Sequence, residues 1–193
     1  MIQKFEFKET EIPGLIEVTP FNADDIRGCF TKDYSKEVFE SNGITHNLAE
    51  VFYTTSYKGV IRALHFQREM QQAKLVRCIH GHVFDVVVDL RPESPAFKKW
   101  LGFDLTGDNK KELLIPGGCA HGYLVLEESI VSYKCGEKFY GEFDDGIMWN
   151  DPEIGVNWPL DKIGGEDKLI VADKDMNLQS FDEFMSKYGG LSF

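Results

Sequence analysis

Apolar residues recur along the chain in short stretches that mostly alternate with polar residues. On a β-strand, side chains two positions apart share a face, so this alternation is typical of strands with one buried side. Turn residues separate the stretches at intervals of roughly 8–12 residues, a spacing typical of sandwiches and barrels. We therefore expect strands at 1–20 (broken by Pro13-Gly14), 51–56, 60–67, 74–90 (broken near Gly81), 100–105, 113–115, 123–126 and 130–135, the last two forming a hairpin around 127–129.

Two segments carry helix signals. Ser35 can cap a short helix at 36–40 that ends at Asn42-Gly43. Residues 180–183 match a capping box, which predicts a C-terminal helix through Tyr188. Residues 22–25 are predicted as a polar loop, and the pattern weakens into loops after residue 140.

Many short strands with only flanking helices predict an all-β fold, a β-sandwich or jelly roll. We expect one domain over residues 1–193, with a helical C-terminal extension over about 176–193. No glycine-rich phosphate loop joins a strand to a helix, so nucleotide folds of that type are not expected.

Charge and cysteine content narrow the classes of protein. The net charge of −11 disfavours nonspecific binding to nucleic acid. The four cysteines form no C-x-x-C pair, and we expect reduced core residues of a cytoplasmic protein. The N-terminus lacks the apolar stretch of a signal peptide, and no apolar run approaches the ~18 residues of a membrane helix. We therefore expect no membrane partner.

The stretch 60–67 places a cation and an imidazole three residues apart in an apolar run. Strict alternation puts His65 on one face with Ile61 and Ala63, and Arg62 on the other, unless a bulge turns one of them. Two interpretations follow from these residues alone. His65 is either a general base beside an anion-binding Arg62, or a hydrogen-bonded core histidine near a surface arginine.

The other titratable residues are ambiguous when taken singly. His46 lies in a polar segment and is expected at the surface. His80, His82 and His121 faintly resemble the ligands of metal-binding cupins, although Gly81 fits a strand break that leaves two of the rings no common direction. Arg27, Lys74 and Tyr133 could equally be ordinary surface or core residues.

Several motifs follow one another in order along the chain. They are Arg27-Gly28-x-Phe30, Arg62-Ala63-Leu64-His65-Phe66-Gln67, Gln72-x-Lys74-Leu75-Val76-Arg77, Phe84 to Arg91 with Ser94-Pro95, Ile115-Pro116-x-Gly118-x-Ala120-His121-Gly122, Tyr133-Lys134, Trp149-Asn150-Asp151-Pro152, Trp158-Pro159 and Lys174-Asp175. Over roughly residues 14–176, this order resembles the dTDP-4-dehydrorhamnose 3,5-epimerase family.

The resemblance implies a cupin-type jelly roll, a homodimer, no metal or organic cofactor, and a nucleotide-diphosphate sugar as substrate. The ketone at C4 of a 4-keto-6-deoxy sugar acidifies the C–H bonds at C3 and C5, and inversion needs a base on one face and an acid on the other. The resemblance makes His65 the base, Asp175 the carboxylate that orients it, Tyr133 the acid and Lys74 the cation at the enolate. Asp85 is a weaker candidate for the orienting carboxylate.

The resemblance also implies substrate contacts. Arg62, His121 and Lys174 match positions of this kind, and Arg27 matches a nucleotide or diphosphate contact supplied from the neighbouring subunit.

Some positions depart from the family pattern. Lys32 stands where a glutamate is usual, Glu50 replaces glutamine, Phe52 replaces asparagine and Asp145 replaces a common glutamate, while Thr54 and Ser56 keep hydroxyls. A carboxylate only accepts hydrogen bonds and phenylalanine does neither, so the residues expected to hold the nucleotide are altered. The alternatives left open are another nucleotide or sugar, a single epimerisation at C3 or C5, a metal-binding cupin enzyme, and a non-catalytic sugar-nucleotide binder.

Overall fold

Two long strands, β7 (Lys74–Asp89) and β10 (Cys119–Cys135), pair antiparallel along their whole length and bend together at mid-length. The bend coincides with Gly81 of β7 and with register shifts between Val125 and Val131 of β10. Gly81 has a φ of 80°, and a Cβ there would collide with the carbonyl oxygen of Glu128. Only glycine fits this turn, because it needs both a positive φ and no side chain.

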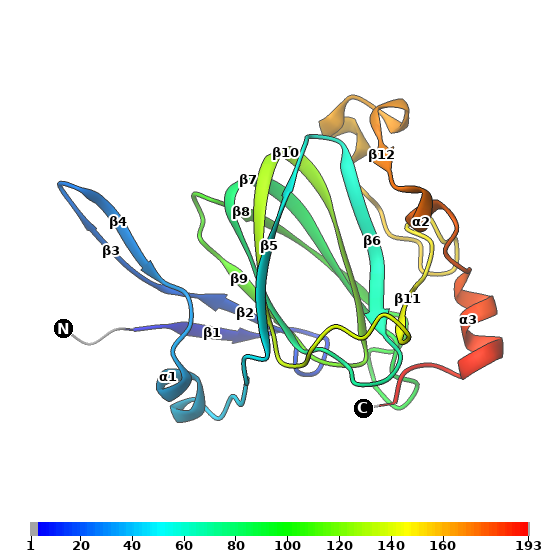
Figure 1. Ribbon diagram of the computed structural model, residues 1–193, viewed down its shortest axis with the longest axis horizontal. Helices are drawn as coiled ribbons and strands as arrows, with labels where there is room; N and C mark the ends of the chain where they lie inside the picture. The colour runs from blue at the N-terminus through cyan, green and yellow to red at the C-terminus, as the bar shows by residue number, and fades with distance from the viewer. Residues whose placement is uncertain (1–3, 193) are drawn as a thin grey trace.

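The bend divides a ten-stranded sheet, counted over the described residues 4–192, into two walls. In this computed structural model its other strands are β1 (Glu6–Glu9), β2 (Ile16–Thr19), β5 (Glu50–Ser56), β6 (Val60–Gln67), β8 (Trp100–Thr106), β9 (Glu112–Ile115), β11 (Asp144–Gly146) and β12 (Ile170–Val171). Strands β3 (Phe21–Asp25) and β4 (Gly28–Lys32) lie outside this sheet. The helices are α1 (Lys36–Ser41), α2 (Asp173–Met176) and α3 (Phe181–Tyr188), with 3-10 turns at Leu160–Ile163 and Glu166–Lys168 (Figure 1).

The first wall joins β6, the first half of β10, the second half of β7, and β8. The second wall joins β5, the second half of β10, the first half of β7, then β9, β2 and β1. Apolar side chains from both walls form one buried cluster, including Val83, Val87 and Tyr123 from the first and Val76 and Val131 from the second. The architecture is a jelly roll, which confirms the all-β prediction.

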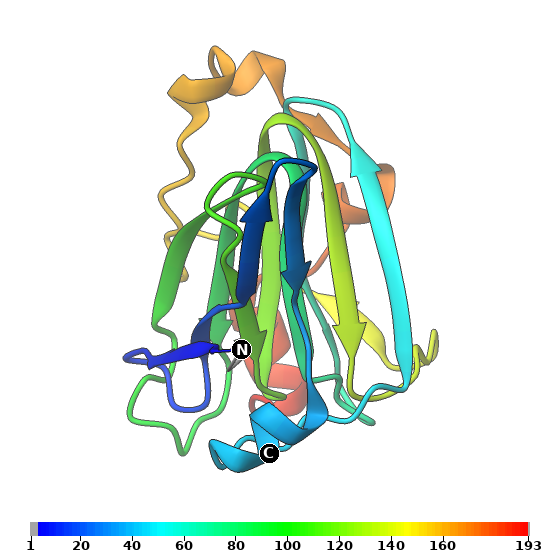
Figure 2. The ribbon, with the colours of Figure 1, turned by 90° about the vertical axis from the view of Figure 1, so that its left-hand side faces the viewer.

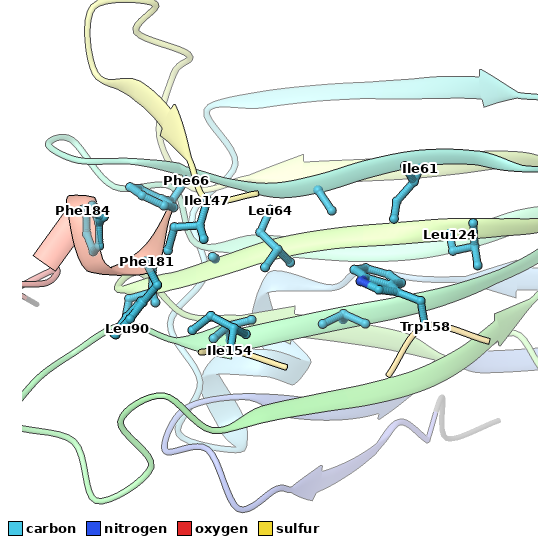
Figure 3. Close-up of a cluster of buried hydrophobic side chains, with 14 of the residues drawn as sticks. Ile61, Leu64, Phe66, Leu90, Leu124, Ile147, Ile154, Trp158, Phe181 and Phe184 are labelled. Carbon is cyan, nitrogen blue, oxygen red and sulfur yellow. The ribbon is translucent and has the colours of Figure 1, made fainter. Parts of the chain in front are cut away.

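The C-terminal segment covers the outer face of the first wall. Leu64 and Leu124 point into a second cluster there, where Ile154, Trp158 and Phe184 pack against them (Figure 3). The predicted C-terminal helix is confirmed as α3, with the capping box at Ser180 and a left-handed Gly189 at its end. Burial of this face fixes the segment 147–191, which contains β12 and α2, beside β6.

A two-stranded hairpin of β3 and β4 extends from the body of the molecule (Figures 1 and 2). The prediction of a polar loop at 22–25 was therefore wrong, because these residues pair with 28–31. Ile26 at the hairpin tip is fully exposed, and Phe30 is 56% exposed. The hairpin thus presents apolar side chains that its own chain does not cover.

Other local predictions need correction. Residues 127–129 do not join a hairpin, because the two halves of β10 pair with β7 rather than with each other. The helix at 36–41 forms, but the Ser35 side chain makes no capping hydrogen bond. His46 is 4% exposed rather than on the surface, and its Nε2 lies 3.0 Å from the carbonyl oxygen of Lys134. Of the four free cysteines, Cys29 is exposed and the other three are buried.

Within residues 4–192, none of the helices is long and apolar enough to cross a membrane.

Candidate active site

Arg62 and His65 both face the interior between the two walls because β6 carries an extra residue. His65 pairs with His121 and Arg62 pairs with Tyr123, so three steps on β6 match two on β10. Ala63 and Leu64, the residues between them, are fully buried in the outer cluster, and the backbone of Leu64 bonds to Ile147 instead. This bulge overrides the strict alternation, which had put the two side chains on opposite faces.

A cavity of about 480 Å³ opens between the two walls. The first wall contributes Arg62, His65 and His121, and the second wall contributes Phe52, Thr54, Lys74 and Tyr133. The C-terminal segment closes one side with Ile170, Val171, Ala172, Lys174 and Asp175. Residues that are far apart in the chain therefore meet around one cavity.

His65 and Asp175 lie within hydrogen-bond distance of each other at the cavity wall. The Nε2 of His65 lies 3.1 Å from Oδ1 and 3.2 Å from Oδ2 of Asp175. The carboxylate side chain is 7% exposed and the imidazole 23%. Because β12 pairs parallel with β6, the following helix α2 carries Asp175 to His65. When Nε2 carries a proton and donates it to Asp175, Nδ1 holds a lone pair that can accept another.

A second imidazole–carboxylate pair lies deeper. The Nε2 of His121 is 2.9 and 3.0 Å from the two oxygens of Asp85, and both residues are buried. Asp85 therefore contacts His121, and its candidacy as the partner of His65 was wrong. Burial raises the pKa of Asp85, while the charges of His121 and Lys74 act in the opposite direction.

Lys74 and Tyr133 stand on neighbouring strands of the second wall. Burial lowers the pKa of Lys74, and the charges of Cys135, Asp144 and Asp85 partly offset this effect. Burial raises the pKa of Tyr133 well above its usual value, so the phenol keeps its proton. The ring of Phe52 stacks on that of Tyr133 with centroids 4.9 Å apart and planes at 13°.

Hydroxyls on β5 were noted in the sequence without a role, and the structure gives them partners. Ser56 Oγ accepts a hydrogen bond of 3.1 Å from Nε of Arg62, and Thr54 Oγ1 lies 2.8 Å from the hydroxyl of Tyr123. Period-two spacing of Thr54 and Ser56 with Phe52 was the available signal, because it puts all three on one face of the strand. Tyr123 was missed, since nothing in its sequence surroundings marks it.

Four sequence-predicted contacts are not among the residues that line the described cavity. Arg27 and Lys32 lie on the β3–β4 hairpin, where Arg27 pairs with Asp25 at 2.5 Å. Glu50 accepts a 3.1 Å hydrogen bond from the backbone N–H of Phe139, and Asp145 lies 3.2 Å from Nε of Arg68. Lys174 does reach the cavity and contacts Asp144.

The histidines that resembled cupin metal ligands do not converge. His82 contacts Asp104 at 2.6 Å on the outside of the first wall, whereas His121 contacts Asp85 inside. Within residues 4–192, no group of three or more histidine, cysteine or acidic side chains is arranged to hold a metal ion.

Comparison with known proteins agrees with the motif order. The family model described as dTDP-4-dehydrorhamnose 3,5-epimerase matches residues 9–183. The enzyme of that name from Methanothermobacter thermautotrophicus is 42% identical over 93% of this chain and 96% of its own length. The one from Escherichia coli K12 is also 42% identical, over 91% and 94%. The dTDP-6-deoxy-D-glucose-3,5-epimerase RmlC of Legionella pneumophila, solved with dTDP-4-keto-L-rhamnose, superposes with a TM-score of 0.91 at 33% identity, covering 98% of this chain and 99% of that one.

The jelly roll and these relatives make the protein an isomerase, of the class that epimerises nucleotide sugars. More narrowly, the chain belongs to the dTDP-4-dehydrorhamnose 3,5-epimerase family.

Proposed function

We propose that the protein epimerises a nucleotide-linked 4-keto-6-deoxy-hexose at C3, C5 or both by proton transfer through an enolate. The preferred reaction is of the type dTDP-4-dehydro-6-deoxy-glucose to dTDP-4-dehydro-rhamnose, the activity in the names of the relatives. The observation that carries the proposal is that the His65–Asp175 pair and the Tyr133 phenol enter one cavity from different walls. Inversion needs a base and an acid on opposite sides of the sugar, because one group removes a proton from one face and another returns a proton to the opposite face.

His65 acts as the base. Its Nδ1 takes the proton from the carbon next to the ketone, while Asp175 stabilises the imidazolium that forms. The electron pair of the broken C–H bond moves to the ketone oxygen and gives an enolate.

Lys74 stabilises the enolate oxygen and Tyr133 returns the proton. A fixed cation in a partly water-excluded site stabilises developing negative charge strongly, since no solvent has to reorganise. The raised pKa of Tyr133 supports its role as acid, because the phenol is protonated when the enolate forms. His121 and Arg62 are proposed to contact the sugar and diphosphate, with Lys174 at the cavity edge.

We further propose a homodimer in which Arg27 and Lys32 of one subunit contact the nucleotide bound by the other. The exposed Ile26 and Phe30 support this proposal, because a hairpin with uncovered apolar side chains is suited to a partner surface. Light scattering on the purified protein and its Arg27→Ala variant tests it. A monomer would remove the proposal, whereas a dimer that binds nucleotide more weakly when Arg27 is changed supports it.

A monofunctional epimerase, or one for another nucleotide or sugar, is the second candidate. Phe52 stacks on the proposed acid, and Glu50 contacts the backbone instead of lining the cavity. A 3′-monoepimerase, ChmJ of Streptomyces bikiniensis, shares the fold with a TM-score of 0.84 at 25% identity over 94% of this chain. The altered residues around Tyr133 therefore support this second candidate, in which only C3 or only C5 is epimerised.

We also infer a single domain over residues 1–193 and a cytoplasmic location. Both walls and the C-terminal segment share continuous clusters of buried side chains, which supports one domain. Three buried free thiols fit a reducing compartment.

Solvent exchange tests the function. The 4-keto sugars with dTDP, CDP and GDP are incubated with the protein in deuterated water, and deuterium at C3 and C5 is followed by NMR. Deuterium at both carbons supports a 3,5-epimerase, and deuterium at one supports a monofunctional enzyme. No deuterium at either carbon with any nucleotide would leave a non-catalytic binder or a different chemistry, and a His65→Ala variant that still exchanges would mean that the base is wrongly assigned.

A further inference from the structure

Tyr123 is a buried phenol that lies beside the proposed acid Tyr133. It has no role in the proposed mechanism. Its side chain is fully buried on β10, in the first wall, and its hydroxyl lies 2.8 Å from Thr54 Oγ1 on β5, in the second wall. The hydrogen bond thus crosses the interior from wall to wall. A buried hydroxyl needs such a partner, because a polar group without one destabilises the folded state.

The same crossing point lies next to Tyr133. Thr54 pairs with Val131 and Phe52 pairs with Tyr133, so Thr54 and Tyr133 occupy adjacent inward-facing positions of neighbouring strands. The ring of His121 is 6.3 Å from that of Tyr123 and 5.9 Å from that of Tyr133. Burial is the largest cause of the raised pKa of Tyr133, and the neighbouring Tyr123 and Asp85 add to it. The three hydroxyls therefore form one group, with Thr54 at the cavity lining.

Tyr133 lines the cavity, but most of its side chain is shielded from water. It is 8% exposed, and Phe52 covers one face of its ring. An acid that gives its proton to the sugar carbon must regain one before the next turnover. A chain of hydroxyls that ends at the cavity supplies such a route.

We propose that Tyr123 and Thr54 form a hydroxyl chain that positions the Tyr133 phenol and returns its proton. The inference rests on the proposed function, in which Tyr133 is the acid. The Tyr133 O–H bond breaks as the new C–H bond forms, and the resulting phenolate takes the proton of Tyr123. Tyr123 takes that of Thr54, and Thr54 takes one from water in the cavity. The proton that His65 removed neutralises the hydroxide left behind, so charge and protons balance.

The test compares exchange with inversion in Tyr123→Phe. His65 still removes and returns protons in this variant, so deuterium enters the substrate with retained configuration. Inversion depends on Tyr133, so its rate should fall about tenfold or more relative to the rate of exchange. This is a part of the roughly 10²–10⁴-fold rate increase that a general acid contributes. Both rates come from one NMR time course in deuterated water. Thr54→Val, which replaces the hydroxyl by a methyl of similar shape, lowers the same ratio, whereas Thr54→Ser restores it.

Tyr57→Phe is the matched control, because Tyr57 is 69% exposed in the turn after β5 and the change should leave both rates as they are. If Tyr123→Phe does not fold, as judged by circular dichroism, Thr54→Val carries the test. An unchanged ratio in the folded variants, or an equal fall of exchange and inversion, overturns the hydroxyl chain while leaving the epimerase. Absence of exchange in the unaltered protein removes the epimerase function and the chain with it.

Discussion

Arg62 and His65 point into the same cavity although strict strand alternation would separate them. Two steps on β10, from His121 to Tyr123, match three steps on β6. The extra residue lets Ala63 and Leu64 fill the outer cluster while the side chains of Arg62 and His65 face inward. The proposed base and the proposed anion-binding guanidinium are thereby held on one strand, and Ser56 accepts a hydrogen bond from the guanidinium.

Asp175→Asn should keep the shape of the site and lose the charge that stabilises the imidazolium. We expect deuterium exchange to fall by roughly 10²–10⁴-fold, the range for loss of effective general-base catalysis, with a much smaller change in KM. Steady-state rates and NMR exchange measure this. Asp173→Asn, an exposed change on the same helix, is the control and should exchange normally. Equal activity of the two variants would contradict the role of Asp175.

The lowered pKa of Lys74 should limit the rate at alkaline pH. In the proposed mechanism the ammonium stabilises the enolate, so activity should be lost as pH rises through a pKa below the ordinary 10.5. The Lys74→Arg variant should be slower, but its rate should start to fall only at higher pH, because a guanidinium stays charged. Rates of exchange measured across pH values test this.

Lys58→Arg, at an exposed turn, is the control and should leave the pH profile unchanged. If Lys74→Arg loses activity over the same alkaline pH range as the unaltered protein, another group causes the loss.

Glu112 should make the protein less stable as pH rises. It is fully buried, both carboxylate oxygens are without a hydrogen-bond partner among the described residues, and burial raises its pKa well above 4.5. The folded state therefore holds a proton that the unfolded state loses above pH 4.5, and stability falls as pH rises through the interval between the two pKa values. Glu112→Gln should raise the Tm at pH 8 by about 2–4 °C or more, the shift that ~1 kcal/mol gives at this chain length.

The Tm difference between Glu112→Gln and the unaltered protein should shrink as pH is lowered toward 4.5, because the glutamate is then protonated in both states. Differential scanning calorimetry at several pH values measures it. Glu9→Gln, on the exposed side of β1, should give no such pH dependence. A Tm difference that stays the same at all pH values would contradict a raised pKa of Glu112 in the folded state.

Glu50 should act through Phe139. Its carboxylate accepts the backbone N–H of Phe139, whose side chain lines the cavity. Loss of a hydrogen bond to a charged group costs about 1.5–3 kcal/mol, so Glu50→Ala should loosen this segment and raise KM by roughly tenfold or more. Glu50→Gln keeps an acceptor and should stay near the unaltered KM. Direct reading of the nucleotide by Glu50 would instead make Glu50→Gln change the preference among dTDP, CDP and GDP sugars.

Most strands of the two walls, the all-β class and the family could be predicted from the sequence, whereas β3, β11 and β12 could not. Alternation marked β5, β6 and β8, the capping box marked α3, and the ordered motifs marked His65, Lys74, Tyr133 and Asp175. These features are local or depend only on residue order, so they can be read without coordinates.

Which side chains meet could be seen only in the folded chain. A bulge moves one residue out of register without changing composition, so nothing in 60–67 fixed the direction of Arg62. Likewise, His65 and Asp175 are 110 positions apart, and Asp85 meets His121 because β7 and β10 pair along their length. Such contacts depend on the packing of two bent strands and a returning C-terminal segment, and therefore appear only when the whole chain is folded.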